Sequence, residues 1–345
     1  MTDPANPLGL NGFEFVEFTS PDPLAMARQF EQLGFVPTHR HLTKNITRYK
    51  QGRINLMLNR DADGRVAQFR NEHGASASAM AFRVADPAKA MEWALAHGAK
   101  PTIEDDTVIE GIGGSYLYFI QDGIDLYADW AEIPGWQEAE AKNNVGLDLL
   151  DHLTHNVRRG QMRVWSEFYK TLFGFEEQKY FDIKGQATGL FSQAMIAPDK
   201  AIRIPLNESQ DDKSQIEEFI REYKGEGIQH LALTTPDIFD TVERLRARGV
   251  RLQDTIETYY ELVDKRVPGH GEDLERLRKN RILIDGNVGD EGILLQIFTE
   301  NMFGPIFFEI IQRKGNEGFG NGNFQALFES IELDQIRRGV IKVDA

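Results

Sequence analysis

The feature that most constrains the fold of this chain is an internal duplication. Residues 76–100, SASAMAFRVADPAKAMEWALAHGAK, align without a gap with residues 227–251, GIQHLALTTPDIFDTVERLRARGVR. Each copy has the pattern of a short apolar strand, a turn containing aspartate, a helix with apolar residues at helical spacing, and a terminal glycine. The repeat predicts that the two halves of the chain share one architecture.

A second repeat lies upstream in each half. NGFEFVEFTSPDP precedes the helical LAMARQFEQLGF, LDHLTHNVRRG precedes QMRVWSEFYKTLFGF, and one gap aligns the two pairs. Strand-like runs such as GSYLYFIQD and GILLQIFTE follow later in each half. Each half thus contains two modules of a strand, a helix and further strands, which predicts an α+β fold of two tandem domains. The polar segment 129–145 is the expected junction, so we place the domains at 1–140 and 141–345.

Composition narrows the possible partners. The 345 residues carry a formal charge of -15, which repels nucleic acid phosphates and anionic membrane surfaces. The chain has no cysteine, so any metal must be held by nitrogen and oxygen ligands. No signal-peptide pattern begins the sequence, and no apolar run approaches the roughly 18 residues that span a bilayer. We expect a soluble cytoplasmic protein with no nucleic acid or membrane partner.

Three polar residues interrupt apolar strand patterns in the second half. His230 stands where the first half has Ala79, His152 heads an equivalent strand whose counterpart lies near Phe13, and Glu309 lies within PIFFEIIQR. A buried carboxylate without a partner is strongly destabilising. Two imidazoles and one carboxylate are typical ligands of non-haem Fe(II). The residues alone are also compatible with two hydrogen-bonded core histidines and a glutamate paired with arginine, and they do not decide between the two.

A resemblance to a known family bears on this choice. The segments DHLTHNVRRGQM, FYKTLFGF, YFDIKGQATGLFSQAM, RIPLNE, KSQIEEF, GEGIQHLAL, ILLQIFTE, FFEIIQRKG and GFGNGNFQALFESIE occur in this order over about residues 150–340. Together they resemble the 4-hydroxyphenylpyruvate dioxygenase family. The first half is similar more loosely, as a copy of the vicinal-oxygen-chelate module without metal ligands. The resemblance implies two tandem vicinal-oxygen-chelate, or glyoxalase-like, domains, each of two βαβββ modules that form an open barrel.

The resemblance also implies the site residues. It assigns Fe(II) to His152, His230 and Glu309 and excludes His155; strand alternation says only that His152 and His155 cannot both be ligands on one regular strand. The residues implied to contact or orient the substrate, the first four of them also in catalysis, are Ser192, Asn207, Gln215, Gln296, Phe298, Phe319, Phe324 and Leu327.

The glycine-rich run at residues 318–323 precedes an amphipathic C-terminal helix, expected at about 323–338 with Asn323 as its N-cap. The run lacks the βαβ context of a dinucleotide-binding fingerprint, which excludes that function. The resemblance implies that the helix is a lid over the site, with the glycines as a hinge. The alternative is a helix that packs on the core only to stabilise it.

The implied activity converts 4-hydroxyphenylpyruvate and O₂ to homogentisate and CO₂ in tyrosine and phenylalanine catabolism. One alternative is 4-hydroxymandelate synthase, which uses the same substrate and metal but hydroxylates the side chain. Another is a non-catalytic small-molecule-binding protein of the same fold, which needs no metal. The family tends to oligomerise, so we expect a homo-oligomer.

Overall fold

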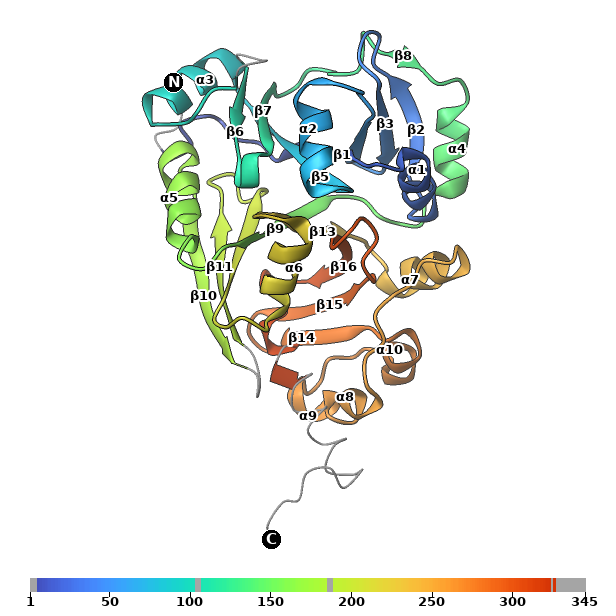
Figure 1. Ribbon diagram of the computed structural model, residues 1–345. Coiled ribbons are helices and arrows are strands. Elements are labelled where there is room, and N and C mark those ends of the chain that lie inside the picture. Colours follow the sequence, from blue (N-terminus) through green and yellow to red (C-terminus); the bar gives the residue numbers. More distant parts are fainter. Residues whose placement is uncertain (1–4, 103–106, 185–188, 324, 327–345) are drawn as a thin grey trace.

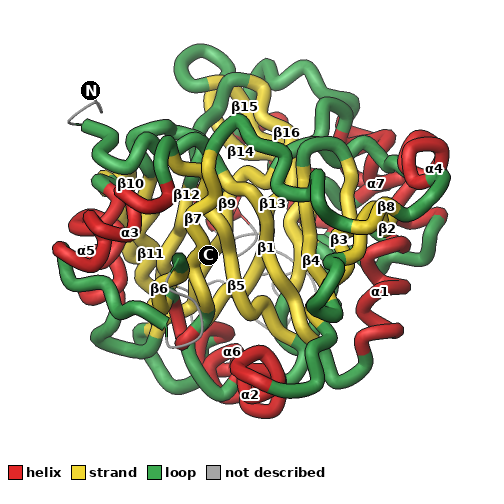
Figure 2. Tube along the Cα trace, turned by 90° about the horizontal axis from the view of Figure 1, so that it is seen from above, coloured by secondary structure: helices red, strands yellow, loops and turns green. Residues whose placement is uncertain are grey.

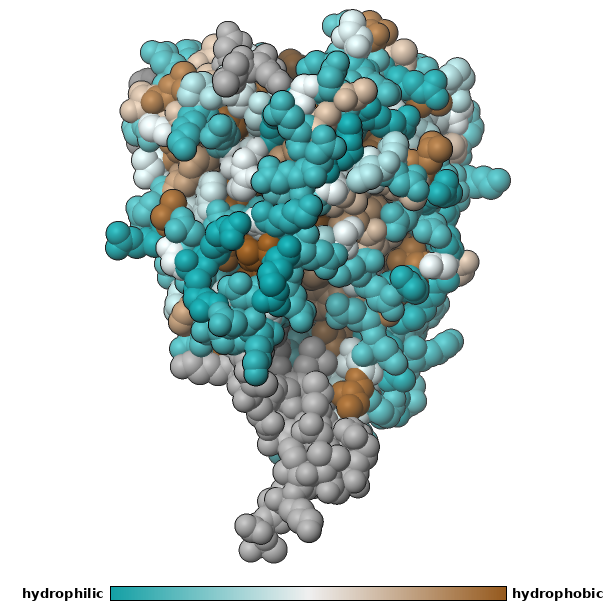
Figure 3. All heavy atoms as spheres, in the orientation of Figure 1, coloured by the Kyte–Doolittle hydropathy of each residue, from teal (hydrophilic) through white to brown (hydrophobic). Residues whose placement is uncertain are grey.

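Each half of the chain forms one eight-stranded sheet with helices on its outer side (Figures 1 and 2). The computed structural model describes residues 5–102, 107–184, 189–323 and 325–326. None of the helices in these ranges is long and apolar enough to pass through a membrane. The face shown in Figure 3 is mostly hydrophilic, with apolar residues scattered over it.

The first sheet is built from residues 13–132. Its strands are β1 (Phe13–Thr19), β2 (Val36–Arg40), β3 (Ile46–Gln51), β4 (Ile54–Asn59), β5 (Ser76–Val84), β6 (Val108–Glu110), β7 (Tyr116–Gln121) and β8 (Ala131–Glu132). They lie in the order β6-β7-β5-β1-β4-β3-β2-β8. The helices of this half are α1 (Pro23–Gln32), α2 (Gly64–His73), α3 (Pro87–Ala96), the 3-10 turn η1 (Ile112–Gly114) and α4 (Trp136–Asn143).

The second sheet repeats this plan. Its strands are β9 (Leu150–Val157), β10 (Glu176–Lys184), β11 (Gly189–Ile196), β12 (Arg203–Ser209), β13 (Gly227–Thr234), β14 (Leu283–Asn287), β15 (Gly292–Phe298) and β16 (Phe307–Lys314). The helices are α5 (Met162–Phe173), α6 (Gln215–Tyr223), α7 (Ile238–Ala247), α8 (Glu257–Glu261), α9 (Val263–Arg266) and α10 (Leu274–Asn280). The order is β10-β11-β12-β9-β13-β16-β15-β14, and within the described ranges its end strands do not pair, so the barrel is open.

The local signals expected from the sequence begin and end the helices. Asp86 accepts a hydrogen bond from the backbone of Lys89 at the start of α3, and Asp237 accepts from Asp240 at the equivalent start of α7. Gly174 ends α5 at φ 69°, a left-handed conformation that favours glycine. The predicted modules of a strand, a helix and further strands are present in both halves, but the second module of the first half has only β6 and β7 after α3, because β8 pairs with β2 at the other end of the sheet.

The two halves pack through aromatic side chains. Phe303 of the second half lies with its ring centroid 5.4 Å from that of Phe18 and 5.3 Å from that of Phe30, both in the first half. His73 of α2 stacks on Tyr223 of α6, and its Nδ1 lies 2.6 Å from the Tyr223 carbonyl oxygen. These buried contacts hold the first sheet against the sheet that carries the candidate site.

Candidate metal centre

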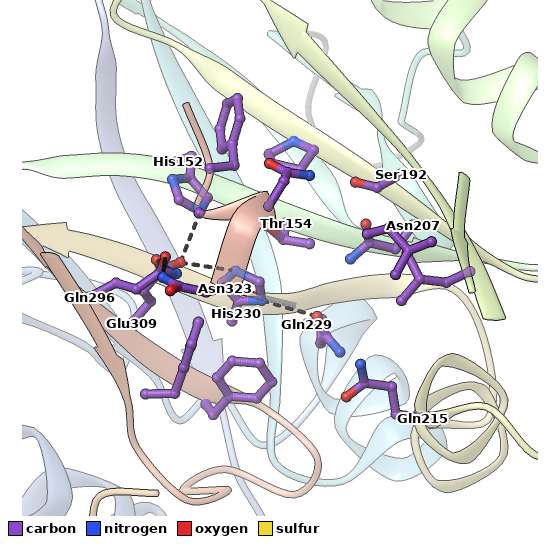
Figure 4. Close-up of a pocket in the computed structure, with 18 of the residues that line it drawn as sticks. His152, Thr154, Ser192, Asn207, Gln215, Gln229, His230, Gln296, Glu309 and Asn323 are labelled. Carbon is purple, nitrogen blue, oxygen red and sulfur yellow. Dashed lines mark hydrogen bonds and ion pairs between the residues drawn. The ribbon is translucent and has the colours of Figure 1, made fainter. Parts of the chain in front are cut away.

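Three neighbouring strands bring His152, His230 and Glu309 together. In the antiparallel pair β9 and β13, His152 is opposite Ala232, and in the parallel pair β13 and β16, Ala232 is opposite Glu309. His230 lies two residues before Ala232, so it projects from the same face of the sheet. Glu309 Oε2 lies 3.2 Å from His152 Nε2 and 3.4 Å from His230 Nε2 (Figure 4).

The three side chains fit a metal ion. One ligand atom from each can be chosen so that all lie within 4.8 Å of one another. All three residues are at least 90% buried, and no arginine or lysine pairs with Glu309 within the described ranges. The alternative of a glutamate paired with arginine is therefore wrong. Two imidazoles and a carboxylate without a thiolate form the donor set typical of a non-haem iron site that leaves positions open.

A buried ion pair orients His152. Its Nδ1 donates to Asp151 Oδ2 at 2.8 Å, and Arg313 binds both carboxylate oxygens of Asp151 at 2.8 and 2.7 Å. Burial raises the pKa of Asp151, but hydrogen bonds from Arg313 and His152 outweigh this and hold it well below its usual value. Asp151 stays charged and keeps the His152 proton on Nδ1, which leaves Nε2 free to bind a metal.

The other two residues have partners of their own. His230 Nδ1 donates to Gln229 Oε1 at 3.0 Å, which leaves its Nε2 facing Glu309. Gln296 Nε2 donates to Glu309 Oε1 at 3.0 Å. Burial acts to raise the pKa of Glu309, but the neighbouring imidazoles outweigh it and lower that pKa to about 2. Glu309 is thus an anion held between two imidazoles.

A pocket of about 270 Å³ opens from these side chains. Figure 4 shows His152, His230 and Glu309 on one side, and Ser192, Asn207 and Gln215 on the other. The remaining lining is mainly apolar, and within the described ranges it includes no lysine or arginine. Between these two ends the lining combines apolar side chains with polar ones such as Thr154 and Gln229, so the pocket suits a flat ligand with a polar group at each end.

The structure brings together most of the predicted substrate residues. Ser192 and Asn207 are opposite each other on β11 and β12, and Gln215 is the first residue of α6. The remaining pocket-lining residues of the prediction are Gln296, Phe298 and Phe319. The ring centroid of Phe319 lies 5.2 Å from that of His152, and that of Phe298 lies 6.4 Å from that of His230.

The predicted C-terminal helix is only partly covered. Phe324 and Leu327, and with them most of the expected 323–338 span, lie outside the described residues. Asn323 was predicted to be the N-cap, and this is wrong because helical backbone already begins at Asn321. The Asn323 side chain instead donates to Gln296 Oε1 at 2.9 Å and accepts from the Tyr259 hydroxyl at 2.6 Å.

Sequence reasoning missed several residues of the site. Asp151 and Gln229 each directly precede a candidate ligand, and a polar residue next to histidine inside an apolar strand was a signal available for both. Thr154, Gln253 and Asn323 also line the pocket. Their role depends on contacts between distant segments, and local patterns carry no sign of those contacts.

His155 lies on the other face of β9, away from the pocket. Its Nε2 lies 2.7 Å from the Tyr169 hydroxyl of α5, and none of its side chain is exposed. The expectation that His152 and His155 face opposite ways is therefore confirmed. Burial lowers the pKa of His155 to about 3, so the ring is neutral in the folded protein.

This neutral histidine predicts an acid-dependent loss of stability. The folded pKa is about 3 and the ordinary value is 6.5, so the unfolded chain binds the extra proton between these pH values. The contribution of His155 to the free energy of unfolding is complete above pH 6.5. It is lost as pH falls toward 3, at about 1.4 kcal/mol per pH unit. The free energy of unfolding, measured with urea at several pH values, should depend less steeply on pH in His155→Gln than in wild type. Equal slopes would contradict this account.

The first sheet contains a counterpart of the site without its ligands. Matching the strand pairs places Phe15 at the position of His152, Ala79 at that of His230, and Tyr118 at that of Glu309. The rings of Phe15 and Tyr118 pack together with centroids 5.5 Å apart. The first half therefore has Phe15, Ala79 and Tyr118 at the positions of the three candidate ligands.

Comparisons with known proteins agree with this arrangement. Residues 5–131 match a family model described as the N-terminal part of hydroxyphenylpyruvate dioxygenase, and residues 149–262 match the glyoxalase, bleomycin resistance protein and dioxygenase superfamily. The chain is 56% identical to a 4-hydroxyphenylpyruvate dioxygenase of Pseudomonas aeruginosa over 97% of both chains. It is 48% identical to one of Legionella pneumophila over 98% of both.

Among solved structures, a mutant of 4-hydroxymandelate synthase from Streptomyces coelicolor is similar. The TM-score is 0.80 at 27% sequence identity, and the match covers 94% of this chain and 99% of that chain.

Proposed function

The chain belongs to the 4-hydroxyphenylpyruvate dioxygenase family, and from this premise we propose how its residues carry out the reaction. The chain is a dioxygenase that converts 4-hydroxyphenylpyruvate and O₂ to homogentisate and CO₂. The observation that carries the proposal is a pocket with three candidate metal ligands at one end and neutral hydrogen-bonding groups at the other.

We propose that His152, His230 and Glu309 hold Fe(II). The fit rests on their converging atoms and on partners that fix each ligand: Asp151 for His152, Gln229 for His230 and Gln296 for Glu309. Iron bound there would supply the redox chemistry for O₂ and the positive charge that the pocket lacks for a carboxylate substrate.

The protein side chains orient the substrate. The 2-keto acid group points toward the iron ligands, and the phenol hydroxyl reaches Ser192, Asn207 and Gln215, which offer both donors and acceptors. Phe298 and Phe319 contact the ring, where offset and edge-on aromatic contacts contribute about 0.5–1.5 kcal/mol beyond burial. The apolar lining excludes water from the reacting atoms, and Phe324 and Leu327 are proposed to extend this wall.

The identity of the product tests the proposal. We expect protein loaded with Fe(II) to consume O₂, release CO₂ and form homogentisate from 4-hydroxyphenylpyruvate, as resolved by chromatography. Formation of 4-hydroxymandelate would instead assign the chain to the side-chain-hydroxylating reaction of its structural neighbour. Iron binding without turnover would favour a non-catalytic binding protein.

The domain division and assembly stay proposals. We place the boundary at residue 140, within α4, whose Glu140 pairs with Lys50 of β3 at 2.8 Å and so ties the helix to the first sheet. A homo-oligomer and a cytoplasmic location are expected from the family. Light scattering on the purified chain measures its oligomeric state.

A further inference from the structure

A chain of hydrogen bonds runs from Glu309 through two other pocket-lining side chains to the buried hydroxyl of Tyr259. Gln296 Nε2 donates to Glu309 Oε1 at 3.0 Å, Asn323 Nδ2 donates to Gln296 Oε1 at 2.9 Å, and the Tyr259 hydroxyl donates to Asn323 Oδ1 at 2.6 Å. No member of the chain is more than 3% exposed. Four buried side chains from β16, β15, the C-terminal segment and α8 are therefore joined in one chain.

The direction of every bond in this chain follows from its first member. An ionised Glu309 only accepts, so Gln296 must present its NH₂ group to Glu309 and its carbonyl oxygen to Asn323. Asn323 must then present its NH₂ group to Gln296, which turns its own carbonyl oxygen toward Tyr259. The Asn323 carbonyl oxygen can pair only with a hydrogen-bond donor, and the Tyr259 hydroxyl is such a donor.

Tyr259 is itself held rigidly. The backbone N–H of Ile284 on β14 donates to its hydroxyl at 2.9 Å, and the Arg266 guanidinium lies 4.7 Å from the centroid of its ring. The hydroxyl also lies 3.1 Å from the Ile284 carbonyl oxygen, to which Arg266 donates, but Asn323 Oδ1 at 2.6 Å is the nearer acceptor for its one proton. Burial raises the pKa of Tyr259 to about 12, so the hydroxyl keeps the proton that it donates. The far end of the chain is thus fixed to the sheet.

The start of the C-terminal segment is pressed against the same side chains. A Cβ at Gly320 would clash with the Gln296 side chain, and a Cβ at Gly322 would clash with Asp285. The Gly322 N–H donates to Asp285 Oδ2 at 2.7 Å. Glycine at these two positions lets the backbone of the C-terminal segment approach Gln296 and Asp285 closely. This explains the two glycines by packing, in addition to the hinge expected from the sequence.

We propose that Tyr259 is a positioning residue for the iron site, acting through Asn323 and Gln296 to fix the carboxylate of Glu309. This inference rests on the proposed function. Because the same amide of Asn323 contacts both Tyr259 and Gln296, the docked position of residues 320–323 and the orientation of Glu309 are coupled. A displaced C-terminal segment would leave the Gln296 carbonyl oxygen buried without its donor.

Tyr259→Phe in the full-length protein tests the proposal. Removal of the hydroxyl leaves Asn323 Oδ1 without a donor, so the Asn323 side chain loses one of the two bonds that hold it against Gln296. We expect affinity for Fe(II), titrated without O₂, to fall about 10–100-fold, the usual effect of losing a partner of a metal ligand. We also expect kcat to fall with little change in KM. An unchanged iron affinity would overturn the proposal, even if thermal stability dropped.

Tyr260→Phe is the matched control. Tyr260 is adjacent, fully buried and in edge contact with the Tyr259 ring, but its hydroxyl takes no part in the chain. We expect its substitution to leave iron affinity within about twofold of wild type. An equal loss of affinity in both variants would overturn the proposal, because the effect would then belong to packing of α8.

A second variant covers the case in which Tyr259→Phe fails to fold. Asn323→Ala breaks the same chain but leaves the bond between Tyr259 and Ile284 in place. It should lower iron affinity to a similar extent, and adding Tyr259→Phe should lower it little further, because residues acting through one chain are not additive. Additive losses would contradict the chain. Iron affinity is measured without substrate. The comparison of variants therefore remains valid even if the wild-type protein forms no homogentisate and the proposed function is wrong.

Discussion

Alanine at His152, His230 or Glu309 should each reduce iron affinity by more than about 100-fold, beyond the typical 10–100-fold loss for a partner that only supports a ligand. Each substitution removes one of the three candidate ligands. Alanine at Glu309 also removes the only negative charge that contacts both imidazoles within the described ranges. Iron bound per chain, measured after anaerobic loading and desalting, reports the result directly.

Two controls make this experiment specific. His155→Ala removes a buried histidine from the same strand and should retain iron, because its ring faces α5. Glu309→Gln keeps the volume of the side chain but removes its charge, and it should lose iron nearly as completely as Glu309→Ala. If His155→Ala lost iron and His152→Ala retained it, the assignment of ligands would be wrong.

Removal of the C-terminal segment should abolish turnover while the candidate ligands remain. A chain ending at Lys314 keeps His152, His230 and Glu309 but loses Phe319, which contacts the His152 ring, and Asn323, which orients Gln296. We expect it to bind iron at saturating Fe(II) and to lose at least about 100-fold in kcat, because small errors in placement have effects of this size. Iron content, thermal unfolding and homogentisate formed per O₂ consumed are the measurements.

A smaller deletion separates two roles of the segment. A chain ending at Ala326 retains Phe319 and Asn323 and removes only residues 327–345. If these residues form the predicted lid, this chain should bind iron with wild-type affinity yet waste O₂ without forming product. Full coupled activity of either truncated chain would contradict the lid, and loss of the folded core would show that the segment is needed for stability instead.

The sequence allowed prediction of the features that repeat along the chain. The two modules of each half and the aspartate and glycine residues that bound α3, α5 and α7 all follow from local periodicity and conformational preference. The three candidate ligands were singled out because a polar residue interrupts an apolar strand, a signal that needs no knowledge of distant contacts, and the family resemblance then assigned the metal to them. The opposite orientation of His155 followed from strand alternation in the same way.

Contacts between distant segments could not be predicted. Asn323 precedes an amphipathic run and has the local pattern of a cap, yet its partners are Gln296 and Tyr259, the latter 64 positions away. The counterpart of His152 was expected near Phe13 and is Phe15. Pairing between β1 and β5 shifts register between these two positions, and an irregularity of that kind changes the count along a strand.

The placement of the candidate ligands on β9, β13 and β16 determines when the site can form. They lie side by side in the sheet but about 80 residues apart in the chain, so an unfolded chain must close two long loops to assemble them. The unfolded chain therefore offers no preformed metal site, so the metal cannot nucleate folding. We expect it to bind only after the central strands have paired. Dissociation of a ligand strand requires opening the middle of the sheet, so bound iron should slow unfolding while leaving the folding rate unchanged. It would lengthen the lifetime of the native state without shortening the time needed to reach it.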